Sequence, residues 1–127
     1  MINQKVKLLK QIKKLPILFS GASHLLYGIL SLTVPFYKSE FIRYGFEDFR
    51  WMIGGAQMVF GICLLIGLRF YNLRLLSSLG LALLMAGALS TRMVIGDGFI
   101  ASAPAFVYLA VNLYILTNTL KHKKWDI

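Results

Sequence analysis

Hydrophobic and charged positions alternate in long blocks along this chain. Four stretches contain no Lys, Arg, Asp or Glu, and they cover residues 15–37, 51–68, 75–91 and 98–120. A helix rises about 1.5 Å per residue and a bilayer core is about 30 Å thick, so roughly 20 such residues cross a membrane. The pattern predicts an all-α protein with four membrane helices, at about 15–37, 51–68, 73–95 and 98–120.

The segments around these runs complete the predicted architecture. The connections are short, which predicts one antiparallel bundle and a single membrane domain over 1–127. Residues 1–14 form a basic amphipathic segment, and 121–127 form a basic tail. The long first run is interpreted as a permanent helix rather than as a cleavable signal.

The connection 38–50 is predicted to contain a short interfacial helix. Ile42, Phe46 and Phe49 recur at helical spacing, and charged residues recur beside them. Two interpretations remain open for this segment. It anchors the chain at the membrane interface, or it covers a cavity that faces outward.

Charge and composition set the class of protein and its orientation. Hydrophobic residues make up 57% of the chain and charged residues 15%, against about 25% charged in an ordinary soluble domain. Ten cations lie in the termini and the connection between the second and third runs: Lys5, Lys7, Lys10, Lys13, Lys14, Arg69, Arg74, Lys121, Lys123 and Lys124. The connections on the opposite side carry equal numbers of acids and cations, so the positive-inside rule predicts that both termini are cytoplasmic. The net charge of +9 thus reflects topology, and no nucleic acid partner is expected.

The N-terminal lysines are candidate contacts for lipid headgroups. Lys5, Lys7, Lys10, Lys13 and Lys14 accompany an apolar helical side, and each lysine near an anionic leaflet contributes about 1 kcal/mol. The alternative is a basic tail that only sets the orientation. Pro16 permits a bend between this segment and the first membrane helix.

An internal echo places polar residues inside the membrane. The first helix contains Gly21, His24 and Gly28, and the second repeats this spacing with Gly54, Gln57 and Gly61. The two helices run in opposite directions, which suggests an inverted repeat.

The predicted depths of three polar side chains coincide. From the rise per residue, His24 lies about 15 Å from the inner face, Gln57 about 10 Å from the outer face and Asn112 about 14 Å from the inner face. Polar groups in lipid avoid unsatisfied hydrogen bonds by facing the bundle interior. His24, Gln57 and Asn112 therefore form a candidate ligand site, or hydrogen bonds that fix helix packing at about 0.6 kcal/mol each.

The sequence gives little indication of metal binding, thiol chemistry or catalysis. No second His or carboxylate lies at the depth of His24, and Cys63 is the only cysteine, so neither a metal site nor thiol relay chemistry is expected. No catalytic triad or phosphate-binding motif is present, and no catalytic residue is predicted. At the outer interface, Arg92 is expected to pair with Asp97, or to contact an anion or headgroup.

The residues arranged in this way resemble the DoxX-like family of small four-helix membrane proteins. The resemblance covers about 16–120 and rests on the central glycines of the first helix, the run 53–67, and 87–92 followed by Gly96, Asp97 and Pro104. It implies the four-helix architecture, and it favours the inner (cytoplasmic) membrane of a bacterial cell over an equivalent organelle membrane. Some relatives are similar to subunits of thiosulfate:quinone oxidoreductases, some assemble with soluble detoxifying enzymes, and animal relatives act as chaperones for receptor channels.

Two functions of different classes follow. The first is a non-enzymatic accessory or assembly subunit that acts in the lipid bilayer through protein partners or as a homo-oligomer. The second is a quinone-linked redox subunit, or a binder of a small hydrophobic molecule or lipid, with a pocket around His24, Gln57 and Asn112. No cofactor is expected for the first function, and the second function would use a quinone or a lipid. A small transporter is a third possibility.

Overall fold

The computed structural model of the chain describes residues 2–121, and these form helices and their connections without a β-strand. Their order is α1 (Ile2–Thr33), α2 (Pro35–Tyr44), the 3₁₀ turn η1 (Glu47–Phe49), α3 (Arg50–Ile66), α4 (Tyr71–Ile95) and α5 (Phe99–Lys121). Within this part of the chain, α1, η1 with α3, α4 and α5 supply four stretches long and apolar enough to cross a membrane. The predicted all-α fold with four candidate membrane helices is confirmed.

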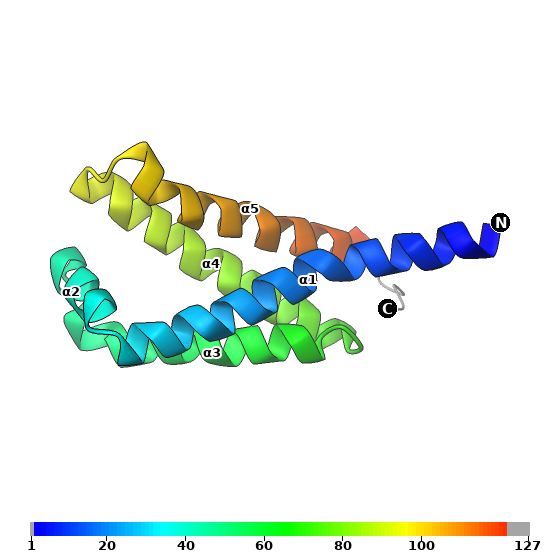
Figure 1. Cartoon of the computed structure of the whole chain (residues 1–127), viewed down its shortest axis with the longest axis horizontal. Coiled ribbons are helices and arrows are strands. Elements are labelled where there is room, and N and C mark those ends of the chain that lie inside the picture. The colour runs from blue at the N-terminus through cyan, green and yellow to red at the C-terminus, as the bar shows by residue number, and fades with distance from the viewer. Residues whose placement is uncertain (1, 122–127) are drawn as a thin grey trace.

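The four long helices form an antiparallel bundle of two main pairs. α1 packs chiefly on α3, α4 packs chiefly on α5, and α3 joins the pairs through α4 (Figure 1). We call the end where α1 begins and α5 finishes the terminal end, and the opposite end, crossed by α2, the α2 end. The two pairs lie close near the terminal end and diverge toward the α2 end in the view of Figure 1.

The echoed glycines are what bring α1 and α3 into contact. A Cβ atom added at Gly61 would lie 2.8 Å from the carbonyl oxygen of Gly21, and one added at Gly28 would lie 2.7 Å from that of Gly54. The first glycine of each motif thus faces the last glycine of the other. Only glycine permits this approach, since any side chain would force the two backbones apart.

The terminal end holds a compact core. Ile17, Leu64, Leu81 and Ile115 come from α1, α3, α4 and α5, and each is at most 1% exposed. Arg74 is also buried there, and it donates hydrogen bonds to the Gly67 carbonyl oxygen at 3.1 Å and to the Thr119 hydroxyl at 3.2 Å. Arg74, one of the cations counted at the connection between the second and third runs, thus lies in the first turn of α4 with its side chain buried. Its charged head ties the α3–α4 connection to α5.

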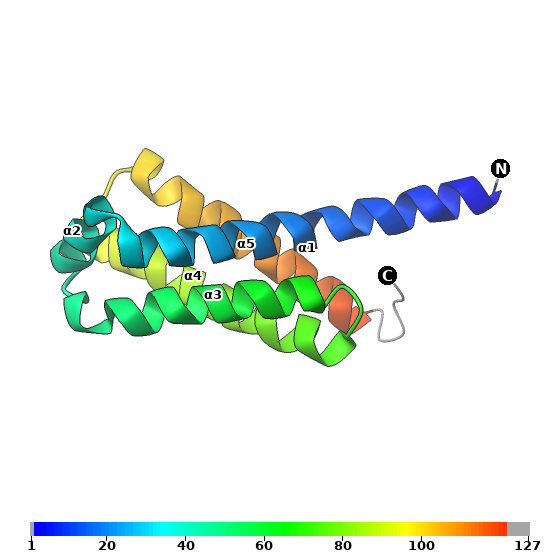
Figure 2. The same ribbon diagram turned by 60° about the horizontal axis from the view of Figure 1, so that its bottom comes forward.

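Two predicted boundaries differ in the structure. α1 continues through Pro16, so the described part of the segment 1–14 belongs to one long helix that extends beyond the bundle (Figure 2). The first membrane helix ends at Thr33 instead of 37, because Pro35 disfavours a helical conformation at Val34 (φ −95°, ψ 126°). Of the predicted basic tail, only its first residue lies within the described residues.

The short helix of the first connection also differs from its prediction. α2 spans Pro35–Tyr44 and stops at Gly45, whose φ of +80° is a left-handed conformation that glycine adopts at low cost. Phe46 and Phe49 therefore lie beyond the helix that carries Ile42. The periodicity of the three residues does not correspond to one continuous helix.

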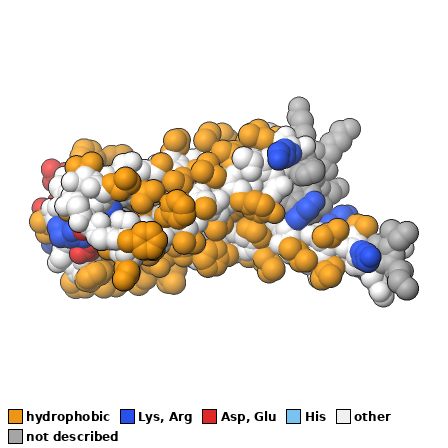
Figure 3. Space-filling model, turned by 90° about the horizontal axis from the view of Figure 1, so that it is seen from above, with side chains coloured by type: hydrophobic (Ala, Val, Ile, Leu, Met, Phe, Trp, Pro, Cys, Tyr) orange, Lys and Arg blue, Asp and Glu red, His pale blue; other side chains and the backbone are white. Residues whose placement is uncertain are grey.

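The outer surface of the bundle is apolar. Large side chains such as Leu76, Met93 and Val59 are more than half exposed. On the face drawn in Figure 3, hydrophobic side chains cover the length of the bundle, and charged side chains gather toward its ends. Such a surface fits a hydrocarbon environment and not water.

Candidate functional site

Three polar side chains meet in the interior between α1 and α5. The Ser20 hydroxyl donates to Asn112 Oδ1 at 2.5 Å, and Asn112 Nδ2 lies 3.2 Å from His24 Nε2. Asn112 Nδ2 also donates to the Tyr108 carbonyl oxygen at 2.8 Å. The structure thus brings His24 and Asn112 together and adds Ser20, with each of the three at most 1% exposed.

The contacts of Asn112 determine which nitrogen of His24 carries the proton. Asn112 Oδ1 accepts from Ser20, so its Nδ2 is the donor toward both Tyr108 and His24. His24 Nε2 is then the acceptor, and the hydrogen of the neutral ring lies on Nδ1.

His24 Nδ1 is buried and has no hydrogen-bond partner among the described residues. A buried donor left in this way costs about 1–3 kcal/mol. Among the buried side-chain polar atoms that the structure describes, it is the one that lacks a partner. Such a group is either a source of strain or half of a contact with something that binds there.

Gln57 lies beside the His24 imidazole and interacts with it, but no atom of its amide is in hydrogen-bond geometry with Nδ1. Both side chains line a cavity of about 700 Å³. Asn112 does not line it, because it lies behind His24 and is fully buried. Of the three residues predicted to share a site, two face the cavity and the third holds the imidazole from behind.

The cavity occupies the α2 end of the bundle. Its walls are mostly aliphatic and aromatic, and they include Leu83, Met85, Ala105, Phe36 and Phe41. Polar groups are concentrated in two places, around His24 at one side and around Arg43 and Arg92 at the other. Pockets for small molecules typically have this volume and this mixture, with a few polar groups in an apolar wall.

An aromatic ring packs against the imidazole and is itself held by a second ring. The ring of Tyr108 lies 5.0 Å from that of His24, and Tyr27 meets Tyr108 edge to face at 5.8 Å. Both tyrosines line the cavity. Aromatic pairs of this geometry hold their rings in place, so the surroundings of His24 are well defined.

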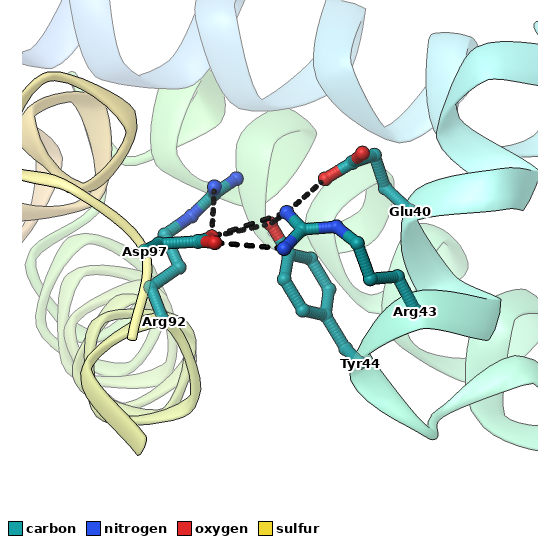
Figure 4. A network of polar contacts seen from close by, with 5 residues as sticks. All are labelled: Glu40, Arg43, Tyr44, Arg92 and Asp97. Carbon is teal, nitrogen blue, oxygen red and sulfur yellow. Dashed lines mark hydrogen bonds and ion pairs between the residues drawn. The ribbon is translucent and has the colours of Figure 1, made fainter. Parts of the chain in front are cut away.

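A charged network ties α2 to the turn between α4 and α5. Arg43 contacts Asp97 through both of its terminal nitrogens, at 2.7 and 3.1 Å, and contacts Glu40 at 2.7 Å (Figure 4). Arg92 lies 3.3 Å from Asp97, so the predicted pair of Arg92 and Asp97 is present. We call Glu40, Arg43, Arg92 and Asp97 the latch. Two positive and two negative side chains give it no net charge.

The latch stabilises its own carboxylates. The hydrogen bond from Arg43 lowers the pKa of Asp97 below its usual 3.8, and it also lowers the pKa of Glu40 below 4.5. Partial burial raises the pKa of Tyr44, which contacts Arg43 at 3.1 Å, to about 12. All these groups therefore keep one protonation state near neutral pH.

Some site residues that were not predicted nevertheless have a signal in the sequence. Ser20 and Tyr108 each lie four residues before a predicted site residue, and therefore on the same helix face as His24 or Asn112. The contact of Arg43 with Asp97 joins positions 54 residues apart and has no local signal. None of the five N-terminal lysines of α1 lines the cavity; Lys5, Lys7 and Lys10 are exposed, and Lys13 and Lys14 are half-buried.

The comparisons with known proteins agree with this architecture. A family profile described as DoxX-like matches residues 16–115, which is most of the chain and includes all of α2, α3 and α4. No curated protein and no solved structure matches the chain. The four candidate membrane helices and the family match together identify the chain as a multi-pass membrane protein that belongs to the DoxX-like family.

Proposed function

We propose that this protein binds a small, mainly apolar molecule in the cavity at its α2 end. The observation that carries the proposal is a cavity of about 700 Å³ within the apolar span of the bundle, with the unpartnered imidazole nitrogen of His24 at its wall. A packing-only role would leave neither the space nor the donor. The candidate ligand classes are a quinone, a lipid or another small hydrophobic compound.

Filling the cavity tests this proposal. Gly87 lines the cavity, and a Cβ atom added there would meet no atom within 4 Å, so Gly87→Phe places a ring in open space. Gly55 is equally free of neighbours but does not line the cavity, which makes Gly55→Phe the matched control. Small molecules that copurify with the protein are then identified by native mass spectrometry.

The expected result separates the two variants. The unaltered protein and Gly55→Phe retain a bound small molecule, and Gly87→Phe loses it. Equal retention by all three proteins would contradict binding in the cavity.

An accessory role is the second candidate, because part of α1 has no cover from the chain itself. Val6, Leu8, Leu9 and Ile12 are each 45–57% exposed, in a helical segment that extends beyond the bundle and carries lysines. We propose that this segment meets the anionic inner leaflet or a partner protein in the cytoplasmic membrane. A photoreactive amino acid at Leu9 is expected to form adducts with protein, and adducts with lipid alone would remove the support for a protein partner.

A further inference from the structure

His24 gives the cavity wall a hydrogen-bond donor that has no partner within hydrogen-bond geometry, although Gln57 lies beside the ring. Its Nε2 is occupied by Asn112, and both the oxygen and the nitrogen of that amide are in use. The ring hydrogen therefore lies on Nδ1, which is buried and unpartnered at the cavity wall. The complement of such a donor is an acceptor oxygen on the molecule that occupies the cavity.

The charges around the cavity favour a neutral occupant. Arg43 and Arg92 line the cavity, but both are engaged by Asp97, and Arg43 is also engaged by Glu40. An anionic headgroup would have to compete with these carboxylates for the guanidinium groups. A cation would find no free carboxylate there, because both acids of the latch are paired.

We infer that the cavity accepts a neutral compound whose carbonyl oxygen takes the hydrogen of His24 Nδ1 and whose apolar body lies between α1, α4 and α5. This inference rests on the proposed function and specifies its ligand class. Tyr108 packs against the imidazole and Tyr27 packs against Tyr108, so the apolar body is left to the aliphatic wall near Met85 and Ala105. Asn112 and Ser20 act as positioning residues, since they fix the tautomer that presents the donor.

The experiment measures the preference for a carbonyl group directly. The full chain in lipid vesicles is photolabelled with benzophenone, a neutral ketone that forms a covalent adduct on illumination. Two competitors are compared at equal concentration in the membrane: dicyclohexyl ketone, and dicyclohexylmethane, which has a CH₂ group in place of the carbonyl. One hydrogen bond predicts that the ketone halves the labelling at a concentration about tenfold lower than the hydrocarbon.

Variants of His24 identify the donor. His24→Asn places an amide N–H near the position of Nδ1, and is expected to keep the preference for the ketone. His24→Gln reaches toward Asn112 instead, keeps that contact, and is expected to lower the ratio between the two competitors to about one. Both variants preserve a polar side chain in the interior. Benzophenone labelling that each variant retains, whatever its ketone preference, shows that the bundle is folded.

The outcomes distinguish this inference from the proposed function. If ketone and hydrocarbon compete equally in the unaltered protein, the inference is overturned, while labelling that is abolished by Gly87→Phe and kept by Gly55→Phe still supports binding in the cavity. If Gly87→Phe leaves the labelling unchanged, the proposed function itself fails.

A last experiment distinguishes two sources of the carbonyl group, a bilayer lipid and a free compound. Ester-linked phospholipids carry carbonyl groups and ether-linked phospholipids do not. If bilayer lipids fill the cavity, benzophenone labelling rises in vesicles of ether-linked lipid because the competitor is absent. Equal labelling in both vesicles indicates a free carbonyl compound, and either result supports the carbonyl site provided that the ketone preference holds.

Discussion

The two ends of the bundle contrast in packing, although the same four helices build both. At the terminal end, Leu64 and Leu81 are completely buried and Arg74 joins the α3–α4 connection to α5. At the α2 end the helix pairs diverge, and the space between them remains as a cavity. Close packing at one end provides the rigid support that a pocket at the other end requires.

The contrast predicts that equal substitutions have unequal effects at the two ends. The largest difference is expected for glycine. Gly61→Val would place side-chain atoms against the backbone of α1, where even a Cβ atom lies 2.8 Å from the Gly21 oxygen, and we expect a loss of about 3 kcal/mol of stability. Gly87→Val extends into the cavity and is expected to change stability by less than about 0.5 kcal/mol.

Thermal unfolding in detergent measures both variants. A similar drop in Tm for Gly61→Val and Gly87→Val would remove the distinction between a closely packed contact and an open cavity.

Leucine truncation gives a second, smaller difference. Leu64 is fully buried in the terminal core, and Leu64→Ala is expected to cost about 3 kcal/mol through lost packing. Leu83 lines the cavity and is 65% exposed, so Leu83→Ala should cost less than about 0.5 kcal/mol. Unfolding in denaturant, followed by circular dichroism, compares the two, and equal midpoints would contradict the description of the terminal end as the stable core.

A substitution in the latch should affect the exchange of the occupant more than the stability. Arg43→Gln removes the contacts that hold α2 to the α4–α5 turn. Exposed ion pairs contribute little, so we expect benzophenone to leave the cavity about threefold faster with Tm unchanged. Arg69→Gln, at the exposed α3–α4 connection, is the control, and an identical release rate in both variants would show that α2 does not limit exit.

The smallest effect is expected from pH. The pKa of Asp97 is lowered by Arg43, so the ion pair persists above pH 3.8 and is lost only as the pH falls through the lowered value. Spin labels at Ser39→Cys and Gly98→Cys, in a Cys63→Ser background, should report one distance from pH 8 to pH 5. A widening within that range would mean that the latch is held by another group.

The sequence was sufficient for the fold because membrane spans are a local property. Charge-free runs and helical rise located the four long helices. The echoed glycines suggest an inverted repeat, and the structure adds that they form the contact of α1 with α3. Helical rise also placed His24 and Asn112 at one depth, where the structure has them 3.2 Å apart. Each of these inferences needs only the spacing along one helix.

The features that were missed depend on how separate helices are placed. The cavity exists because the helix pairs diverge, and no spacing within one helix encodes that angle. The charge pattern groups Arg74 with the cations of the short connection, and its burial against the Gly67 carbonyl oxygen depends on the tertiary arrangement. The latch joins Arg43 to a turn 54 residues later, so its geometry also follows from the tertiary arrangement.

The position of benzophenone adducts tests the central claim most directly. Methionine is a reactive site for this probe, and the chain offers Met85 in the cavity wall, 8% exposed, and Met52 and Met93 on the outer surface, 62% and 69% exposed. Peptide mass spectrometry after labelling in vesicles is predicted to find adducts mainly at Met85, despite its burial. Adducts at Met52 and Met93 without Met85 would contradict the claim that the α2 end contains a binding cavity.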